Sequence, residues 1–251
     1  MKLSRTCLKV RNAAGLSNFY TAVLGMRKLG SEDSPAFGYV EEQCLLEFHE
    51  VELQPYQPAS DDLYWKIGIT LQNLDSAVKY LNAQGWPVSA PRQFRDIGYL
   101  CHLQDPEGFQ VELLQQGFEG NHGFPAASGH PIGGQATLAH LTLRVADIEA
   151  IKGLCEGELG MRLMSVQPVP ERGFCLYFYS WNDEPLPDPD LEAVANREWL
   201  WARPYTLLEL QHLEAADRVT LPRNGEAGFA GFAFGDKDLT YLSADRLSKF
   251  F

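Results

Sequence analysis

The chain has 251 residues, of which 45% are hydrophobic and 12% aromatic, so it can bury the core of one large domain or of two ordinary ones. Its net charge of −12 argues against binding to a phosphate backbone, which needs a basic surface. The sequence has no apolar run that could span a bilayer, and its first residues lack the apolar segment of a signal peptide. The 5 cysteines are scattered and form no Cys-x-x-Cys pair, which is typical of reduced thiols in a cytoplasmic protein.

The first part of the chain predicts one β-α-β-β-β unit. Residues 3–10 alternate between apolar and polar as a half-buried strand does, and residues 13–24 carry apolar side chains at helical spacing. Gly25 is a typical residue to end that helix. Short strands are expected to follow near residues 26–30, 36–40 and 44–49.

A second unit of the same kind follows. It begins with a strand at residues 66–71 and continues with a helix at 74–83, which ends at Gly85. The sequence Asp-Pro-Glu-Gly at 105–108 predicts a hairpin turn between its last two strands. The three closing strands are expected near residues 87–89, 99–103 and 109–114.

The middle of the chain predicts a boundary. Residues 117–135 are rich in Gly, Pro, Ser and Ala and indicate a linker between a first domain at 1–116 and a second at 136–251. A third unit runs from 138 to about 213 and contains an insertion at 182–204 that is heavy in proline and acidic residues.

A fourth unit starts with a strand at 228–234 and continues with a helix near 239–247, close to the last residue. The three strands that would complete it are missing. We therefore expect a truncated fourth module and a cup that is open on one side.

Two stretches of sequence recur at a fixed distance. Residues 5–10 (Arg-Thr-Cys-Leu-Lys-Val) return as 140–145 (His-Leu-Thr-Leu-Arg-Val), and Leu-Gly-Met-Arg occurs at both 24–27 and 159–162. The second copy lies 135 residues after the first in both cases (140 − 5 and 159 − 24). The two halves of the chain therefore share one architecture.

The repeated units, the run Phe-Tyr-x-x-Val-Leu-Gly-Met at 19–26 and the sequence Asp-Pro-Glu-Gly-Phe-Gln-Val-Glu-Leu at 105–113 together resemble the vicinal oxygen chelate superfamily. That superfamily contains glyoxalase I, the bleomycin-resistance proteins and the extradiol dioxygenases. The resemblance implies an α+β fold in which paired β-α-β-β-β modules form curved, open, mixed sheets. It also implies a metal in the cup of each sheet, held by His or Gln and Glu from the first and last strands of two paired units.

In the first pair of units, these ligand positions fall on Arg5 and Lys66, where the family has histidines, and on Glu47 and Glu112. A guanidinium or a charged ammonium offers no lone pair to a metal. Two such cations balance two carboxylates as a divalent metal would, so we expect a metal-free first cup in which the glutamates pair with Arg5 or Lys66. These cations either bind an anionic or carbonyl ligand or only neutralise the glutamates. His49 shares this face, as a base or as a hydrogen-bonded bystander.

In the second pair, the resemblance keeps His140 and Glu209 as ligands, while the matching position of the fourth unit is Gly231. Two ligands are too few for a tight divalent site. Either a partner subunit or a nearby side chain such as His212 completes a site for zinc, nickel or iron, or the pair is a remnant joined by a hydrogen bond. The insertion at 182–204, with its two tryptophans, either lids this second cup or forms a dimer contact.

The incomplete ligand sets favour a binding protein or a non-metal enzyme that takes a small polar or aromatic molecule in one cup. The alternative is a metal-dependent enzyme that uses His140 and Glu209, either a lactoylglutathione lyase-like glyoxalase or an extradiol ring-cleavage dioxygenase. A third class is an assembly protein with vestigial cups. No residue is assigned a catalytic role. The expected partners are a small-molecule ligand and a second copy in a homodimer, with neither nucleic acid nor membrane.

Overall fold

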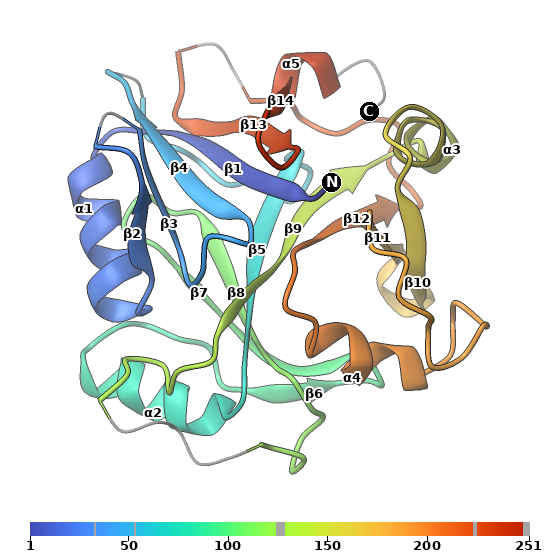
Figure 1. Cartoon of the computed structure of the whole chain (residues 1–251), viewed down its shortest axis with the longest axis horizontal. Coiled ribbons are helices and arrows are strands. Elements are labelled where there is room, and N and C mark those ends of the chain that lie inside the picture. Colours follow the sequence, from blue (N-terminus) through green and yellow to red (C-terminus); the bar gives the residue numbers. More distant parts are fainter. Residues whose placement is uncertain (33, 53, 124–128, 223–224, 248–251) are drawn as a thin grey trace.

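The computed structural model describes residues 1–32, 34–52, 54–123, 129–222 and 225–247. Over these residues the chain forms two curved, open, mixed sheets with helices packed against them (Figure 1). The expected α+β class and the paired-module fold are therefore confirmed. No helix in the described part is long and apolar enough to cross a membrane.

The first unit folds as its sequence predicts. Asn12 caps the first helix by accepting a hydrogen bond from the backbone N–H of Gly15 (2.7 Å), and Gly25, with a φ of 73°, follows its end. A π-helical turn, η1, continues that helix. The elements are β1 (Leu3–Val10), α1 (Ala13–Asn18), η1 (Phe19–Val23), β2 (Arg27–Gly30), β3 (Pro35–Gly38) and β4 (Leu45–Glu50).

The second unit has the predicted hairpin turn. The Asp105 carboxylate accepts hydrogen bonds from the backbone N–H groups of Glu107 (2.9 Å) and Phe109 (3.0 Å) and so holds the turn. The strand expected at 87–89 is wrong, because Val88 makes only an isolated bridge and the strand forms later. The elements are β5 (Tyr64–Leu71), α2 (Leu74–Ala83), β6 (Arg92–Phe94), β7 (Gly98–Gln104) and β8 (Gln110–Gln115).

The third unit carries its insertion between its last two strands. A short helix, α4, lies inside the insertion, and a π-helical turn and a 3-10 turn flank β10. The elements are β9 (Thr137–Val145), α3 (Ile148–Lys152), η2 (Gly153–Glu158), β10 (Arg162–Val169), η3 (Pro170–Arg172), β11 (Phe174–Ser180), α4 (Ala195–Trp201) and β12 (Leu207–Leu213).

The fourth unit contains β13 (Gly228–Phe234), β14 (Thr240–Ser243) and α5 (Ala244–Leu247). The helix expected from 239 is wrong over its first half, because β14 pairs antiparallel with β13, with Phe232 opposite Leu242. β-Branched and aromatic side chains in β14 favour this extended pairing.

The order of the strands corrects which units share a sheet. One sheet has the order β14-β13-β1-β4-β3-β2 and the other β10-β11-β12-β9-β5-β8-β7-β6. Unit one therefore pairs with unit four, through β1 and β13, and unit two with unit three, through β5 and β9. The expectation that units pair within each half of the chain is wrong. The division of the sequence at 117–135 stays a prediction.

Each sheet has a cup face, opposite the face that packs in the shared core. The cup face of the eight-stranded sheet carries Lys66 and His140, and we call it the Lys66 cup. The cup face of the six-stranded sheet carries Cys7 and His49, and we call it the Cys7 cup. His140 is 1% exposed, whereas 49% of the His49 side chain is exposed. The Lys66 cup is therefore the sheltered one.

Candidate functional site

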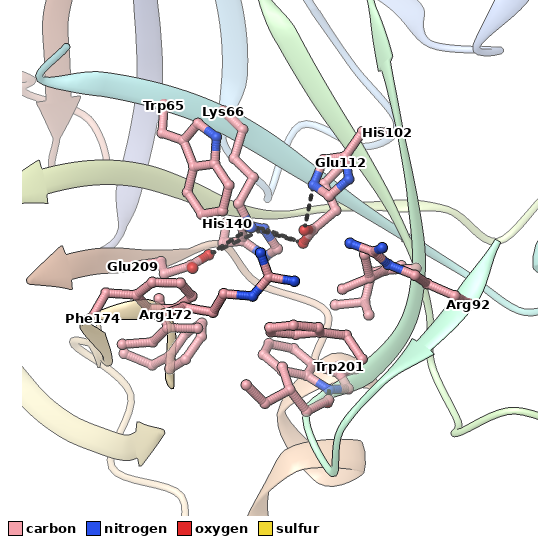
Figure 2. A pocket seen from close by; sticks show the side chains of 16 residues that line it. Trp65, Lys66, Arg92, His102, Glu112, His140, Arg172, Phe174, Trp201 and Glu209 are labelled. Atoms are coloured by element: carbon pink, nitrogen blue, oxygen red, sulfur yellow. Dashed lines mark hydrogen bonds and ion pairs between the residues drawn. The ribbon is translucent and has the colours of Figure 1, made fainter. Parts of the chain in front are cut away.

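Four adjacent strands each place one polar side chain at the bottom of the Lys66 cup (Figure 2). These side chains, which we call the floor, are Lys66 of β5, Glu112 of β8, His140 of β9 and Glu209 of β12. The register brings them level, because Gly68 of β5 lies opposite both Glu112 and His140. Residues that the sequence assigned to two separate cups thus meet in one, since β5 and β9 are neighbours.

The Lys66 ammonium lies in the middle of the floor. Its Nζ is 2.9 Å from Glu112 Oε1, 3.3 Å from Glu209 Oε2 and 3.4 Å from His140 Nε2. His140 Nε2 is itself 3.2 Å from Glu112 Oε1 and 3.3 Å from Glu209 Oε2. Each of the four residues is at most 3% exposed. One cation is therefore surrounded by two carboxylates and an imidazole, out of contact with bulk water.

The charges of the floor stabilise one another. Burial alone would lower the pKa of Lys66, but Glu112 and Glu209 outweigh it and raise the pKa above its ordinary value. Burial alone would raise the pKa of Glu112, but Lys66 and then His102 hold the pKa well below its ordinary value. Lys66 is thus held as an ammonium and Glu112 as a carboxylate.

The floor as it stands does not fit a divalent metal. An ion bound by Glu112, His140 and Glu209 together would have to take the place of Lys66 Nζ, which lies 2.9 to 3.4 Å from an atom of each. A charged ammonium cannot act as a ligand, and its charge repels a metal. His212 adds nothing here, since it lies on the other face of β12 with Nε2 3.2 Å from the Ala146 carbonyl.

Above the floor lies a cavity of about 200 Å³ with apolar walls. Two arginines, Arg92 and Arg172, also line it, and within the described residues neither guanidinium has a hydrogen-bond or ion-pair partner. Figure 2 shows both guanidinium groups beside the floor. The apolar lining consists of Trp65, Phe94, Ile97, Leu100, Leu114, Phe174, Leu176, Phe178 and Trp201.

The insertion forms one wall of this cavity. Trp201 of α4 donates from Nε1 to the Ile97 carbonyl (2.8 Å) and packs edge-to-face on Phe178, with ring centroids 5.2 Å apart. Arg197 of α4 forms an ion pair with Asp96 (2.5 Å) in the turn between β6 and β7. The structure therefore favours one interpretation of the insertion, as a lid that covers the cup shared by units two and three.

His102 also belongs to the site. It lies opposite Glu112 across β7 and β8, with Nε2 3.0 Å from Glu112 Oε2. Its side chain is 25% exposed and lines the cavity. Arg92 and Arg172 were missed as well, because no motif marks them and their proximity depends on the pairing of β6 through β11.

The Cys7 cup holds the remaining predicted residues. Arg5 Nε lies 3.7 Å from Glu47 Oε2, and His49 Nε2 lies 2.9 Å from Glu47 Oε1. The hydrogen bond between Glu47 and His49 lowers the pKa of Glu47 and raises the pKa of His49. The predicted ion pairs, of Glu47 with Arg5 and of Glu112 with Lys66, are confirmed, but the expectation that all four groups share one cup is wrong.

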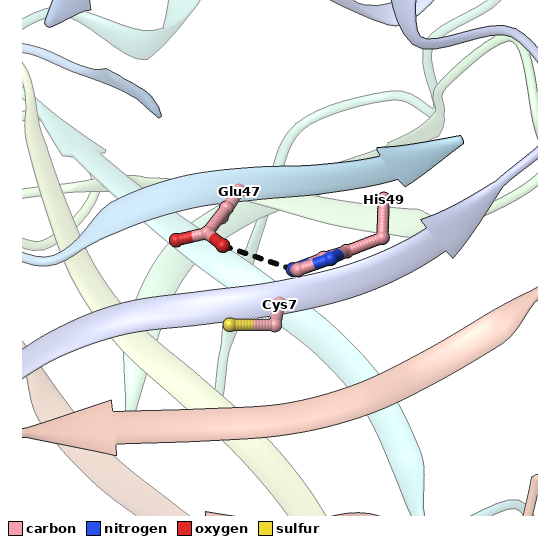
Figure 3. A group of neighbouring side chains, drawn as sticks. All are labelled: Cys7, Glu47 and His49. Atoms are coloured by element: carbon pink, nitrogen blue, oxygen red, sulfur yellow. Dashed lines mark ion pairs between the residues drawn. The ribbon is translucent and has the colours of Figure 1, made fainter. Parts of the chain in front are cut away.

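Cys7 is a further neighbour in the same cup (Figure 3). Its Sγ, a carboxylate oxygen of Glu47 and a ring nitrogen of His49 all lie within 4.8 Å of one another. Strand alternation already places position 7 on the same face as Arg5, so the sequence contained the signal for this cluster.

Paired β-α-β-β-β units in curved sheets, with a polar residue from each of four central strands in the cup, define the vicinal oxygen chelate fold. Residues 2–113 match the model of the Glyoxalase/Bleomycin resistance protein/Dioxygenase superfamily. The resemblance seen in the sequence is therefore confirmed over residues 2–113.

Solved structures of this fold extend the likeness to nearly the whole chain. Glyoxalase I from Zea mays has a TM-score of 0.63 at 15% identity, over 92% of this chain and 73% of that one. A candidate dioxygenase from Bacillus subtilis has a TM-score of 0.54 at 15% identity, over 91% of this chain and 66% of that one. Such identities show a common fold alone. No curated protein matches the chain in sequence.

Proposed function

We propose that the Lys66 cup is a metal-free binding site for a small molecule with an aromatic body and an acidic group. One observation carries this proposal: Lys66 Nζ lies within 3.4 Å of three groups that would otherwise be metal ligands. A buried ammonium in that position pairs with both glutamates and occupies the place that a metal bound by them would take.

The floor itself does not offer Lys66 to a ligand. The ammonium already pairs with two carboxylates, with Nζ 2.9 Å from Glu112 Oε1 and 3.3 Å from Glu209 Oε2, and the ring of His140 lies 3.4 Å from its third side. Of the two roles considered for Lys66, neutralising the glutamates is therefore favoured over binding the ligand directly. The ligand would instead lie above the floor, against the apolar walls.

The cavity limits the size and charge of the ligand. A buried apolar cavity of about 150 Å³ holds a benzene ring, so the volume of about 200 Å³ found here suits one substituted ring. Arg92 and Arg172 are exposed residues that also line the cavity, and within the described part of the chain neither cation has a partner. A carboxylate or a similar acidic group on the ring is the complement that two guanidiniums recognise best.

Titration of the protein with substituted benzoates tests this proposal, with the matching benzyl alcohols and benzylamines as controls. Trp65 and Trp201 line the cavity, so binding should quench tryptophan fluorescence. The acids should bind most tightly, and the Arg92→Ser/Arg172→Ser double variant should lose more than about tenfold in affinity. Arg218→Ser, at an exposed arginine away from the cavity, is the matched control. Equal or tighter binding of the amines would contradict the proposal.

The metal-dependent alternative gains one argument from the structure, since Glu112 now joins His140 and Glu209 in a single cup. It requires Lys66 to leave the floor. Zinc, nickel or iron at one equivalent, measured on protein made without chelators and lost in both His140→Ala and Glu209→Gln, would favour a glyoxalase-like lyase or an extradiol-type dioxygenase.

The assembly and location of the protein also belong to the proposal. All five cysteines, listed in order as Cys7, Cys44, Cys101, Cys155 and Cys175, are free and buried. Free thiols support a cytoplasmic location. We propose a homodimer, which light scattering coupled to gel filtration tests directly.

A further inference from the structure

Strands β1 and β4 place three ligand-type side chains on one surface of the Cys7 cup (Figure 3). They are parallel neighbours, with Cys7 opposite Glu47 and Lys9 opposite His49. Residues two apart on a strand share a face, so His49 follows Glu47 on the side that Cys7 occupies. A thiol, a carboxylate and an imidazole therefore converge, each pair of ligand atoms lying within 4.8 Å.

We propose that Cys7, Glu47 and His49 form a site for a zinc-like divalent cation, separate from the Lys66 cup. Thiolate sulfur, imidazole nitrogen and carboxylate oxygen are the three ligand types that zinc takes in proteins. Three protein ligands leave a fourth, tetrahedral position to water. This site needs none of the floor residues and stands whether or not the Lys66 cup binds the proposed ligand.

The Cys7 thiol is buried (3% exposed) but not hydrogen-bonded among the described residues. Its neighbour Glu47 presents Oε1 to His49, while Oε2 faces Arg5 (3.7 Å) and the hydroxyl of Tyr241 (3.5 Å). These outer contacts orient the carboxylate as the second shell of a metal site does.

The cation has a path to the site. Half of the His49 side chain (49%) is exposed, whereas 12% of the Glu47 side chain is. An ion entering from solvent would meet the imidazole first and the buried thiol last.

Arg5 Nε lies 3.7 Å from Glu47 Oε2. The thiolate of Cys7 and the carboxylate of Glu47 would together balance the two positive charges of a bound ion. The ion with its ligands would therefore present no net positive charge to Arg5.

Cobalt titration followed by absorption tests the proposal, because a cobalt–thiolate bond gives a near-ultraviolet sulfur-to-metal charge-transfer band. Protein stripped with EDTA should bind Co²⁺ at one equivalent, with that band present, and Zn²⁺ should displace it. Cys7→Ser should abolish the band. His49→Gln, at a half-exposed position that the fold tolerates, should weaken binding by more than about tenfold.

Two variants serve as controls. Cys101→Ser makes the same change at a cysteine that is 1% exposed in the other sheet, and it should leave the band unchanged. Glu209→Gln alters the floor of the Lys66 cup and should also leave it unchanged. No binding of Co²⁺, binding without the thiolate band, or binding that survives both Cys7→Ser and His49→Gln would overturn the proposal.

Discussion

Gly68 of β5 lies directly opposite His140 of β9, and any side chain at position 68 would overlap the imidazole ring. The missing Cβ lets His140 lie against β5, where its Nε2 reaches Glu112 and Glu209. Gly68 is therefore part of the floor, although it contributes no chemistry of its own.

Gly68→Ala should displace His140 and destabilise the protein by about 1 to 3 kcal/mol, because an added methyl group overpacks a filled site. Urea unfolding measures this free energy. Gly153→Ala is the matched control, since Gly153 is exposed and a Cβ there would meet nothing within 4 Å. Equal stability of the two variants would show that the ring of His140 does not depend on Gly68.

Lys66→Met should cost about 3 to 5 kcal/mol of unfolding free energy, because it leaves two buried carboxylates without their cation. Arg5→Met, the matching change in the other cup, should cost less than about 1 kcal/mol. Its side chain is 22% exposed and its ion pair with Glu47 is 3.7 Å long. A larger effect of Arg5→Met in denaturant unfolding would contradict the different roles of the two cups.

The stability of the protein should depend on pH through Asp105. Burial raises the pKa of this carboxyl from 3.8 to about 7, against the opposing hydrogen bonds from Phe109 and Tyr20. The folded state therefore binds the proton more tightly than the unfolded state. Stability should rise as the pH falls through the folded pKa of about 7, and stop rising below the unfolded value of about 3.8.

Asp105→Asn should flatten this dependence, because an amide keeps the acceptor for the turn and supplies a donor toward Tyr20. Thermal unfolding of both proteins at a series of pH values measures it. The prediction would be contradicted if the wild type lost stability as the pH fell from neutral to about 5 and Asp105→Asn removed that loss.

Local patterns in the sequence predicted the elements of the fold because each depends on near neighbours. The turn at Asp105 and the first helix follow from hydrogen bonds within a few residues. The pairing of units did not follow, since the same alternation suits any neighbouring strand. β5 and β9 meet through contacts between distant parts of the chain, and the repeat carries no information on that choice.

In the candidate site, too, some features could be predicted from the sequence and others depended on the pairing of distant strands. The ion pairs of Glu47 and Glu112 could be predicted, because they follow from charge balance at positions that the repeat identifies. The place of Lys66 between residues of two units could not, because it depends on the pairing of β5 with β9. Arg92 and Arg172 were beyond prediction for the same reason, since β6 and η3 belong to different units.

We infer that the Lys66 ammonium takes the place of a metal in the floor. The metal content of two proteins tests this inference, and both carry Cys7→Ser so that the other cup is disabled. One keeps Lys66 and the other carries Lys66→His, whose imidazole adds a fourth ligand to Glu112, His140 and Glu209. After incubation with Zn²⁺ or Ni²⁺ and gel filtration, we expect one equivalent of metal in the Lys66→His protein and none in the protein that keeps Lys66. One equivalent of metal in the protein that keeps Lys66, lost on Glu209→Gln, would contradict it.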